Sequence, residues 1–337
     1  DRVSDLGSSL HGNWFAGANE DYTKVALIDS YTMGDTVIYQ WEQGAGERRR
    51  LYGKPLDQRE EREFVTPTAI DSCYYTSGDR GLFFATSLFD DRYGLGYLDL
   101  SEAKNAQPVQ IAGTRHTGEG ELEGLKHVAG SRYLLKYNID GCSWVYEGVF
   151  DEAALRFDVA HVLCGEGLMS NGVLQSLSCD KAGGDFAASF STATSPTQLY
   201  TIEGPDRKVV QHTRQRFEDV PQHALSSGED GSYTSHDGLR VSARLYLPAS
   251  ELGFSGKRPV IFYIHGGPQG QERPDFSWFS MPLIQLFTMS GFAVFVPNVR
   301  GSSGYGLDYM KRVDHDWGGQ DRLDHVAAFE QLRRDER

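Results

Sequence analysis

The sequence predicts a chain of two parts, β-propeller blades over residues 1–228 and the first half of an α/β domain with a mainly parallel sheet over residues 229–337. Three observations predict this fold. The share of aromatic residues is 12% and there are 38 glycines, which favours many short strands joined by tight turns. Strand-like units recur about every 50 residues in the first part. After the polar stretch around Ser226 to Asp230, strands and helices alternate instead.

The repeat is seen in short aromatic strands that end in polar turns. Their tyrosines are separated by 58, 49 and 54 residues, and they are Tyr39, Tyr97, Tyr146 and Tyr200. A four-stranded propeller blade needs a period of roughly 40 to 50 residues. Four to five blades are therefore expected, in a complete or partial ring. Irregular hairpins of a β-sandwich are the alternative, because tyrosine is common in strands.

The second part begins with a predicted hairpin, whose strands at 232–235 and 240–247 flank the turn His236-Asp237-Gly238. The apolar run Val260–Ile264 is typical of a strand buried on both faces. A helix is expected from about Ser277 to Gly291. Its predicted buried stripe consists of Phe279, Leu283, Leu286 and Phe287.

The next predicted strand is Phe292–Val296, closed by Pro297. A last helix is expected from about Asp321, with a stripe formed by Leu323, Val326, Phe329 and Leu332. Strand, helix, strand and helix joined by short connections indicate a βαβ unit with parallel strands.

Charge and composition exclude several classes of function. Lys and Arg total 33 against 47 Asp and Glu, so the net charge of −14 would repel nucleic acids and anionic membranes. The longest nearly apolar stretch, 281–296, is interrupted by polar residues and is shorter than the roughly 20 residues of a membrane-spanning helix. We therefore expect neither a nucleic-acid partner nor a membrane partner.

The cysteines lack the spacing of a metal site. Cys73, Cys142, Cys164 and Cys179 form no C-x-x-C pair, so we expect no metal and thiols buried in the core. A bridge between Cys164 and Cys179 stays open for an exported protein. The compartment is unknown, with the cytoplasm favoured. Because the sequence begins with Asp1, we expect the native N-terminus to lie upstream or to have been removed.

The most informative motif is His265-Gly266-Gly267-Pro268, which follows the predicted strand at Ile264 and precedes a helix. In α/β-hydrolases, this loop supplies a backbone N–H to the oxyanion hole. Glycines let the backbone turn an amide toward the substrate. We therefore predict Gly267 N–H as an oxyanion donor, with His265, Gly266 and Pro268 forming the active-site loop. A tight turn without function is the alternative.

Two further motifs follow in order, Asn298-Val299-Arg300-Gly301-Ser302-Ser303-Gly304-Tyr305-Gly306 and Asp316-Trp317-Gly318-Gly319-Gln320-Asp321-Arg322-Leu323-Asp324. Together with the Gly-Gly-Pro loop, this set resembles the catalytic domain of the prolyl oligopeptidase family over residues 232–337. The resemblance implies a β-propeller followed by an α/β-hydrolase domain, and no cofactor. His265 makes the loop similar to that of the acylaminoacyl peptidase branch.

The resemblance also assigns roles to residues of the three motifs. Gly267 falls at the oxyanion position, and Arg300, Trp317 and Asp321 fall on structural motifs of the family. We expect Arg300 to be a buried, hydrogen-bonded brace, since a guanidinium offers five donors, although a surface position is the alternative. Tyr305 is expected either to line the pocket or to pack in the core.

The sequence departs from the family pattern because it contains no Gly-x-Ser-x-Gly segment. The catalytic Ser, Asp and His are expected beyond Arg337, in that order, as the resemblance implies. None of the 10 histidines, His315 and His325 included, is therefore assigned as the catalytic base. The isolated chain is predicted to be inactive.

The leading hypothesis is a parent serine peptidase that hydrolyses short peptides through an acyl-enzyme, with acylaminoacyl-peptidase-like or dipeptidyl-peptidase-like specificity. The alternatives are a non-catalytic propeller that acts as a binding module and an esterase of the α/β-hydrolase fold. The expected partners are short peptides and the missing C-terminal part of the hydrolase domain, supplied by a longer chain or by a split precursor. A homo-oligomer stays open.

Overall fold

The computed structural model describes residues 5–102, 105–180, 184–276 and 279–337. The chain divides into two compact units. Unit 1 comprises Asp1–Arg115, Leu122–Lys136 and Tyr146–His161, and unit 2 comprises His116–Glu121, Tyr137–Val145 and Val162–Arg337.

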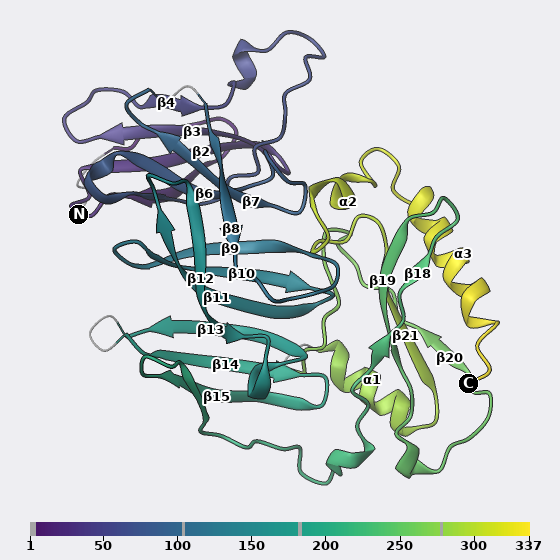
Figure 1. Cartoon of the computed structure of the whole chain (residues 1–337). Helices are drawn as coiled ribbons and strands as arrows, with labels where there is room; N and C mark the ends of the chain where they lie inside the picture. Colours follow the sequence, from purple (N-terminus) through teal and green to yellow (C-terminus); the bar gives the residue numbers. More distant parts are fainter. Residues whose placement is uncertain (1–4, 103–104, 181–183, 277–278) are drawn as a thin grey trace. The chain divides into compact units, whose positions relative to one another are not determined.

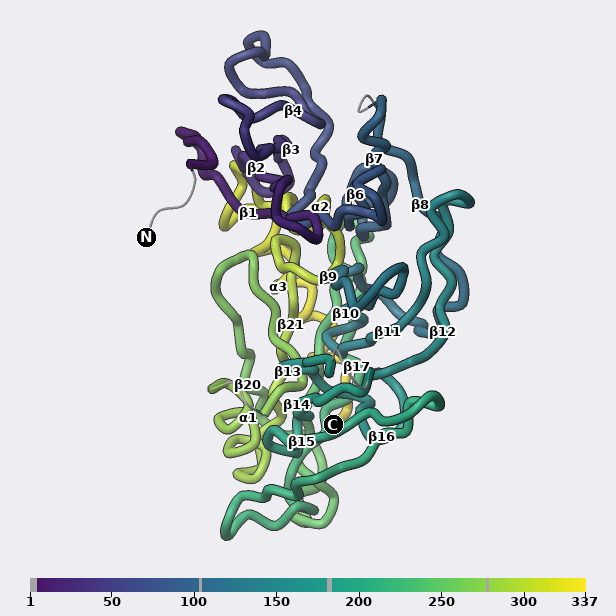
Figure 2. The backbone as a smooth tube through the Cα atoms, turned by 90° about the vertical axis from the view of Figure 1, so that its left-hand side faces the viewer, coloured from purple at the N-terminus to yellow at the C-terminus, as the bar shows by residue number. Residues whose placement is uncertain are grey.

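The first part of the chain is almost entirely β structure, arranged in three sheets (Figures 1 and 2). The first sheet holds β1 (Asn13–Ala18), β2 (Lys24–Thr32), β3 (Asp35–Glu42) and β4 (Arg49–Tyr52). The second has the order β5-β6-β7-β8-β12-β11-β10-β9. Its strands are β5 (Cys73–Tyr75), β6 (Gly81–Thr86), β7 (Gly94–Asp99), β8 (Gln107–Ala112), β9 (Gly120–Ala129), β10 (Arg132–Ile139), β11 (Cys142–Asp151) and β12 (Arg156–Cys164).

The third sheet holds β13 (Gly172–Cys179), β14 (Phe186–Thr192), β15 (Ser195–Glu203) and β16 (Lys208–Gln211). Strands β1 to β4, β5 to β8 and β13 to β16 pair antiparallel with their sequence neighbours, and β8 pairs with β12 in parallel. Short 3-10 helices are η1 (Leu56–Gln58), η2 (Ser77–Asp79), η3 (Gly167–Met169), η4 (Gln222–Ala224) and η5 (Ser250–Leu252).

The predicted strands at the four repeat tyrosines are confirmed, and all four occupy equivalent places. They lie in β3, β7, β11 and β15, each the third strand in a run of four along the chain. Alternation along these strands sends aromatic side chains into the core. In unit 1, Phe83 of β6 stacks on Phe150 of β11 with ring centroids 4.0 Å apart. The sequence repeat therefore corresponds to successive four-stranded units.

The last part of the chain, within unit 2, is a small mixed sheet with helices. Its strands are β17 (Glu229–Asp230), β18 (Tyr233–Thr234), β19 (Arg240–Tyr246), β20 (Val260–Phe262) and β21 (Ala293–Asn298). The order is β17-β19-β21-β20, with β18 paired to β19, and β20 runs parallel to β21. The predicted hairpin and parallel pair are confirmed, and β20 is an edge strand.

Two helices cover opposite faces of this sheet, α1 (Ser280–Met289) and α3 (Gln320–Leu332), and the short α2 (Leu307–Lys311) lies between β21 and α3 in sequence (Figure 1). Val294 and Val296 pack with Met281 and Ile284 of α1. The alternate residues Ala293 and Phe295 of β21 pack in another cluster, which includes Ala328 of α3. Because neighbouring side chains of a strand point to opposite faces, the two helices sandwich the sheet.

The predicted apolar stripes of both helices are wrong in part: Phe287 and Leu332 pack against the two clusters, but other members of the stripes face away from them. In α1 the buried residues are Ser280, Met281, Ile284, Gln285 and Thr288, whereas Leu283 and Leu286 are 40% and 54% exposed. In α3 only Asp324 and Ala328 are buried, and Val326 and Phe329 are about half exposed. Phe279 is also exposed. The predicted helix start at Ser277 lies outside the described residues.

The prediction of a strand buried on both faces at Val260–Ile264 is also wrong. Strand β20 covers only Val260–Phe262, and Val260 and Ile264 are 42% and 58% exposed. The physical reason is that, among the residues that the structure describes, β20 pairs with β21 alone and its other side is open. Both helices reach this strand: Ile261 packs with the α1 cluster, and Phe262 stacks on Phe329 of α3 at 4.5 Å. We call the free side of β20 and the exposed apolar residues Leu283, Leu286, Val326 and Phe329 the β20 edge.

None of the four cysteines forms a disulfide, so the bridge between Cys164 and Cys179 is absent. Cys73, Cys142 and Cys164 are buried, as expected for core thiols, and Cys179 is half-buried. Within the described ranges, no helix combines the length and the apolar character needed to cross a membrane.

Candidate active site

The Gly-Gly-Pro loop leaves the carboxyl end of β20 and is held by its own histidine. His265 Nδ1 lies 3.1 Å from the carbonyl oxygen of Gly266, and Nε2 lies 3.0 Å from Ser302 Oγ. Gly267 is exposed and has φ of 138°, a conformation that favours glycine. A Cβ at Gly267 would meet the backbone nitrogen of Gln269 at 2.8 Å, whereas a Cβ at Gly266 would meet no atom within 4 Å.

A second loop, residues 299–306, follows the neighbouring parallel strand β21 and touches the first. The Ser303 N–H donates to the carbonyl of Gly270 at 3.0 Å. The half-buried Pro268 lies beside Gly301, whose added Cβ would come within 3.4 Å of the proline Cβ. Because parallel strands bring their carboxyl ends to one edge of a sheet, two of the sequence motifs meet here.

Arg300, the third residue of the second motif, is buried at 4% exposure and makes a two-point contact with Asp324 of α3. Its Nε and Nη2 donate to the two carboxylate oxygens at 2.8 and 2.7 Å. Nη2 also donates to Asp237 at 3.0 Å. Hydrogen bonding to Asp324 is the main cause that raises the pKa of Arg300 above its usual value.

Asp324 closes the third sequence motif, but the structural role was predicted for Asp321, one turn earlier. Asp324 is fully buried, and it accepts a hydrogen bond from Ser235 Oγ at 2.5 Å in addition to those from Arg300. The Tyr233 hydroxyl donates to the Asp324 backbone carbonyl at 2.9 Å. The sequence does contain a signal for the burial of Asp324. Asp324 and Ala328 are four residues apart and therefore share one face of the helix.

The structure does not bring the other two motif residues into this network. Trp317 is 72% exposed. Asp321 lies half-buried in the first turn of α3, and its Oδ1 is buried without a hydrogen-bond partner. One turn later in α3, His325 Nδ1 is also buried without a hydrogen-bond partner. Burial lowers the pKa of His325, and nearby Asp324 opposes this effect.

Tyr305 is buried in a polar network. Its hydroxyl accepts hydrogen bonds from Gln271 Nε2 at 2.9 Å and from Asn298 Nδ2 at 3.1 Å. Burial raises the pKa of Tyr305. Asn298 Oδ1 in turn accepts the Glu272 N–H at 3.0 Å. These bonds join the end of β21 to the segment that follows the Gly-Gly-Pro loop.

Glu121, at the start of β9, also belongs to unit 2 and was not singled out from the sequence. Its carboxylate accepts the N–H groups of Gly304 and Gly306 at 3.1 and 2.7 Å. Asn138 of β10 donates to Gln271 at 2.6 Å. A Cβ at Gly304 would lie within 2.8 Å of both the Gln271 and the Asn138 side chains. Glycine at 304 therefore permits this close packing.

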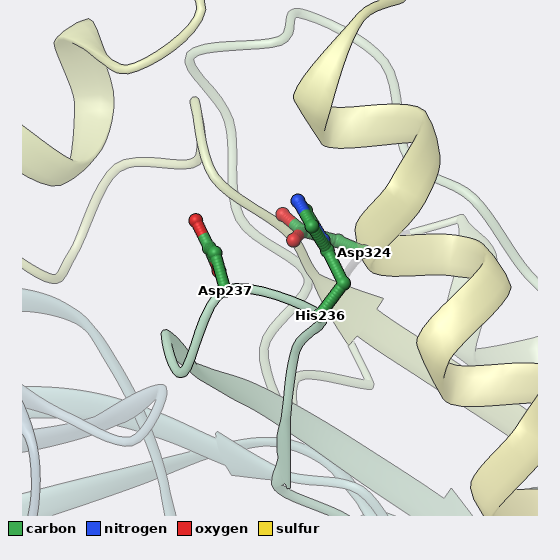
Figure 3. Close-up of side chains that lie close together, drawn as sticks. All are labelled: His236, Asp237 and Asp324. Carbon is green, nitrogen blue, oxygen red and sulfur yellow. The ribbon is translucent and has the colours of Figure 1, made fainter.

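Among the residues that the structure describes, His236, Asp237 and Asp324 bring potential metal ligands together (Figure 3). His236 and Asp237 come from the turn after β18, and Asp324 comes from α3. The guanidinium of Arg300 is already bound to both carboxylates, and His236 Nε2 lies 2.7 Å from Gln320 Oε1. These carboxylates therefore bind the Arg300 guanidinium, and a metal ion would have to compete with it for them.

A family model described as the prolyl oligopeptidase family matches residues 277–336. Over these residues the chain is similar to the prolyl oligopeptidase family. The match covers α1, β21 and the loop with Arg300, as well as α3 with Asp324.

Curated relatives of the family extend the similarity. The chain is 33% identical over 152 residues to the uncharacterized peptidase YuxL of Bacillus subtilis (strain 168), which covers 44% of this chain and 22% of that protein. It is 38% identical over 104 residues to a probable dipeptidyl-peptidase 5 of Aspergillus terreus, covering 30% of the chain and 14% of the relative. The matched part is less than a quarter of either relative.

Solved structures of similar fold cover nearly the whole chain. A prolyl endopeptidase structure superposes with a TM-score of 0.72 at 16% identity, covering 95% of this chain and 42% of that one. A puromycin hydrolase gives 0.69 at 19% identity, covering 97% and 48%. The acylaminoacyl peptidase of Pyrococcus horikoshii gives 0.60 at 18% identity, covering 94% and 45%. The fold of this chain is therefore that of slightly under half of each of these chains.

Proposed function

We propose that this chain is part of a serine peptidase that hydrolyses short peptides through an acyl-enzyme. The observation that carries the proposal is the exposed amide of Gly267, set at the carboxyl end of a parallel strand and tied to the loop after β21. An acyl-transfer reaction needs a fixed N–H donor at this place to stabilise the tetrahedral oxyanion.

In the proposed mechanism, the serine, aspartate and histidine of the triad come from the part of the protein outside residues 1–337. The serine attacks the scissile carbonyl, and histidine accepts its proton and then gives it to the leaving amine. The task of this chain is to donate the Gly267 N–H to the developing oxyanion. One such donor contributes on the order of 10²- to 10³-fold in turnover.

The four-stranded units of the first part are proposed to be blades of a β-propeller. Four tyrosines in the third strand of successive units support this reading. In such an arrangement, the propeller would admit only peptides small or flexible enough to reach the site. Dipeptidyl-peptidase and acylaminoacyl-peptidase relatives support cleavage near an N-terminus.

The proposed partner of the chain is the remaining part of the hydrolase domain. The β20 edge supports this, because an apolar edge strand between two helices with exposed Leu286 and Phe329 resembles a parallel sheet that lacks a strand. A further strand on β20 would cover these side chains and satisfy the free backbone groups of the strand.

The test is hydrolysis by the full-length gene product. Purified protein is assayed with dipeptidyl and N-acyl-aminoacyl p-nitroanilides, with p-nitrophenyl acyl esters as the comparison. Amide hydrolysis with release of a free dipeptide or acyl amino acid is expected. Ester cleavage without amide cleavage would indicate an esterase, and no hydrolysis of either would reject the proposal.

A further inference from the structure

His265 is bonded through both ring nitrogens, and the chemistry of the two partners fixes the position of its proton. The carbonyl oxygen of Gly266 can only accept a hydrogen bond, so the proton must be on Nδ1. In a neutral imidazole, Nε2 then has a lone pair and accepts the hydroxyl proton of Ser302. His265 is therefore a bridge that donates to its own loop and accepts from the loop after β21.

The bond to Gly266 has a consequence for Gly267. The carbonyl of Gly266 and the N–H of Gly267 belong to the same peptide unit, which is planar and trans, so the two groups point in opposite directions. Holding the oxygen thus sets the direction of the N–H. The flanking glycines supply little steric resistance to rotation of this unit, which makes an external restraint necessary.

The anchor on the other side is rigid. Ser302 is only 1% exposed, and its backbone N–H donates to the carbonyl of Val299 at 3.0 Å. Arg300, two residues earlier in the same loop, is locked to Asp324. Ser302 and His265 have the separation of a nucleophile and its base, but a buried hydroxyl cannot reach a substrate. The hydrogen bond between Ser302 and His265 is suited instead to holding the Gly-Gly-Pro loop in position.

We propose that His265 is a positioning residue that aims the oxyanion-donating N–H of Gly267, with Ser302 as its anchor. This inference rests on the proposed function, because an aimed N–H has a catalytic role only in an acyl-transfer enzyme. The hydrogen bonds themselves are independent of activity. They can therefore be tested in the 337-residue chain, whether or not the parent protein is a peptidase.

The first experiment is ¹⁵N–¹H NMR of this chain at pH 7.5, with the ring signals of His265 assigned by comparison with His265→Asn. The expected result is a neutral imidazole with the proton on Nδ1 and an unprotonated Nε2. Ser302→Ala should move the Nε2 resonance and the amide resonance of Gly267. A proton on Nε2, or an unchanged Gly267 amide in Ser302→Ala, would overturn the proposal.

The second experiment measures kcat and KM in the full-length protein. His265→Ala is expected to lower kcat by about 10- to 100-fold with little change in KM, because a misaimed donor weakens only transition-state binding. His265→Asn should restore part of kcat, since its amide N–H can replace Nδ1–H. Ser302→Ala should lower kcat by less than His265→Ala, because the bond to Gly266 remains.

The matched control is His212→Ala, which removes an exposed histidine that lies 2.7 Å from the Thr201 hydroxyl in the β15–β16 pair. It should leave both constants unchanged. An active wild-type enzyme in which His265→Ala keeps its kcat would overturn the positioning role. An inactive wild-type enzyme whose NMR signature is as expected would instead reject the proposed function.

Discussion

Arg300 and Asp324 form a buried ion pair with two parallel hydrogen bonds, from Nε at 2.8 Å and from Nη2 at 2.7 Å. This pair links the loop after β21 to helix α3, and Asp237 and Ser235 attach the turn after β18 to it. Three separate stretches of the sequence are thus fixed around one guanidinium. The anchor of the Gly-Gly-Pro loop, Ser302, lies two residues away along the chain.

Asp324→Asn should destabilise the chain by about 3 to 5 kcal/mol, because it leaves the guanidinium of Arg300 buried with one fewer charged partner. Urea unfolding followed by circular dichroism measures the change. The control is Arg312→Ala, which breaks an exposed pair with Asp308 and should cost about 0.5 kcal/mol or less. Equal effects of the two variants would contradict the assignment of Arg300 as a buried brace.

Gly267→Ala should abolish most of the turnover of the full-length enzyme, by about 10²- to 10³-fold. The added methyl would be strained at φ of 138° and would press on the backbone nitrogen of Gln269, so the N–H would move. Gly266→Ala is a matched control because its methyl would meet open space. Comparable kcat values for Gly266→Ala and Gly267→Ala would remove Gly267 from the oxyanion site.

Protonation of His265 should occur below pH 6.5, because burial lowers its pKa from the usual value. Hydrogen bonding to Gly266 and Asn298 opposes this shift. A protonated His265 in turn lowers the pKa of His325 on α3, whereas Asp324 and Asp321 raise it. As the pH falls, the unfolded chain therefore binds the proton before the folded chain does. The contribution of neutral His265 to the free energy of unfolding is thus complete above pH 6.5 and declines as the pH falls through and below this value. NMR titration of the ring carbon protons measures this pKa, and a value above 6.5 would be inconsistent with the buried contact to Ser302.

Val326→Lys should leave the free energy of unfolding of the 337-residue chain within about 0.5 kcal/mol, because Val326 is half exposed. The same change in the full-length protein should be strongly destabilising if a further strand covers the β20 edge, since a charge would be buried. Ala328→Lys, at a fully buried position, should destabilise both. Equal tolerance of Val326→Lys in the two proteins would mean that nothing covers this edge.

The sequence predicted the strands well, because alternation and turn residues are local signals. The four tyrosine strands, the hairpin before β19 and the parallel strand β21 were all recognisable. The buried faces of α1 and α3 were not, since an apolar stripe is normally taken to face the core of the same chain. Here Leu286 and Phe329 border an edge strand, and the positions against the sheet are filled by Ile284 and Ala328.

The candidate site was predicted in part. Glycine spacing after a strand pointed to Gly267, and five guanidinium donors pointed to a brace at Arg300. The partners of these residues depend on contacts between distant segments, which periodicity does not encode. For that reason the roles of Asp324 and Ser302, which lie in the sequence motifs, and of Glu121 are seen only in the structure.

The most direct test is to treat the full-length gene product with a fluorophosphonate probe and to map the modified peptide by mass spectrometry. The account predicts one labelled serine in a Gly-x-Ser-x-Gly segment outside residues 1–337, with no labelling of the 337-residue chain and none of Ser302. Absence of labelling in an active preparation, or a label on Ser302, would contradict it.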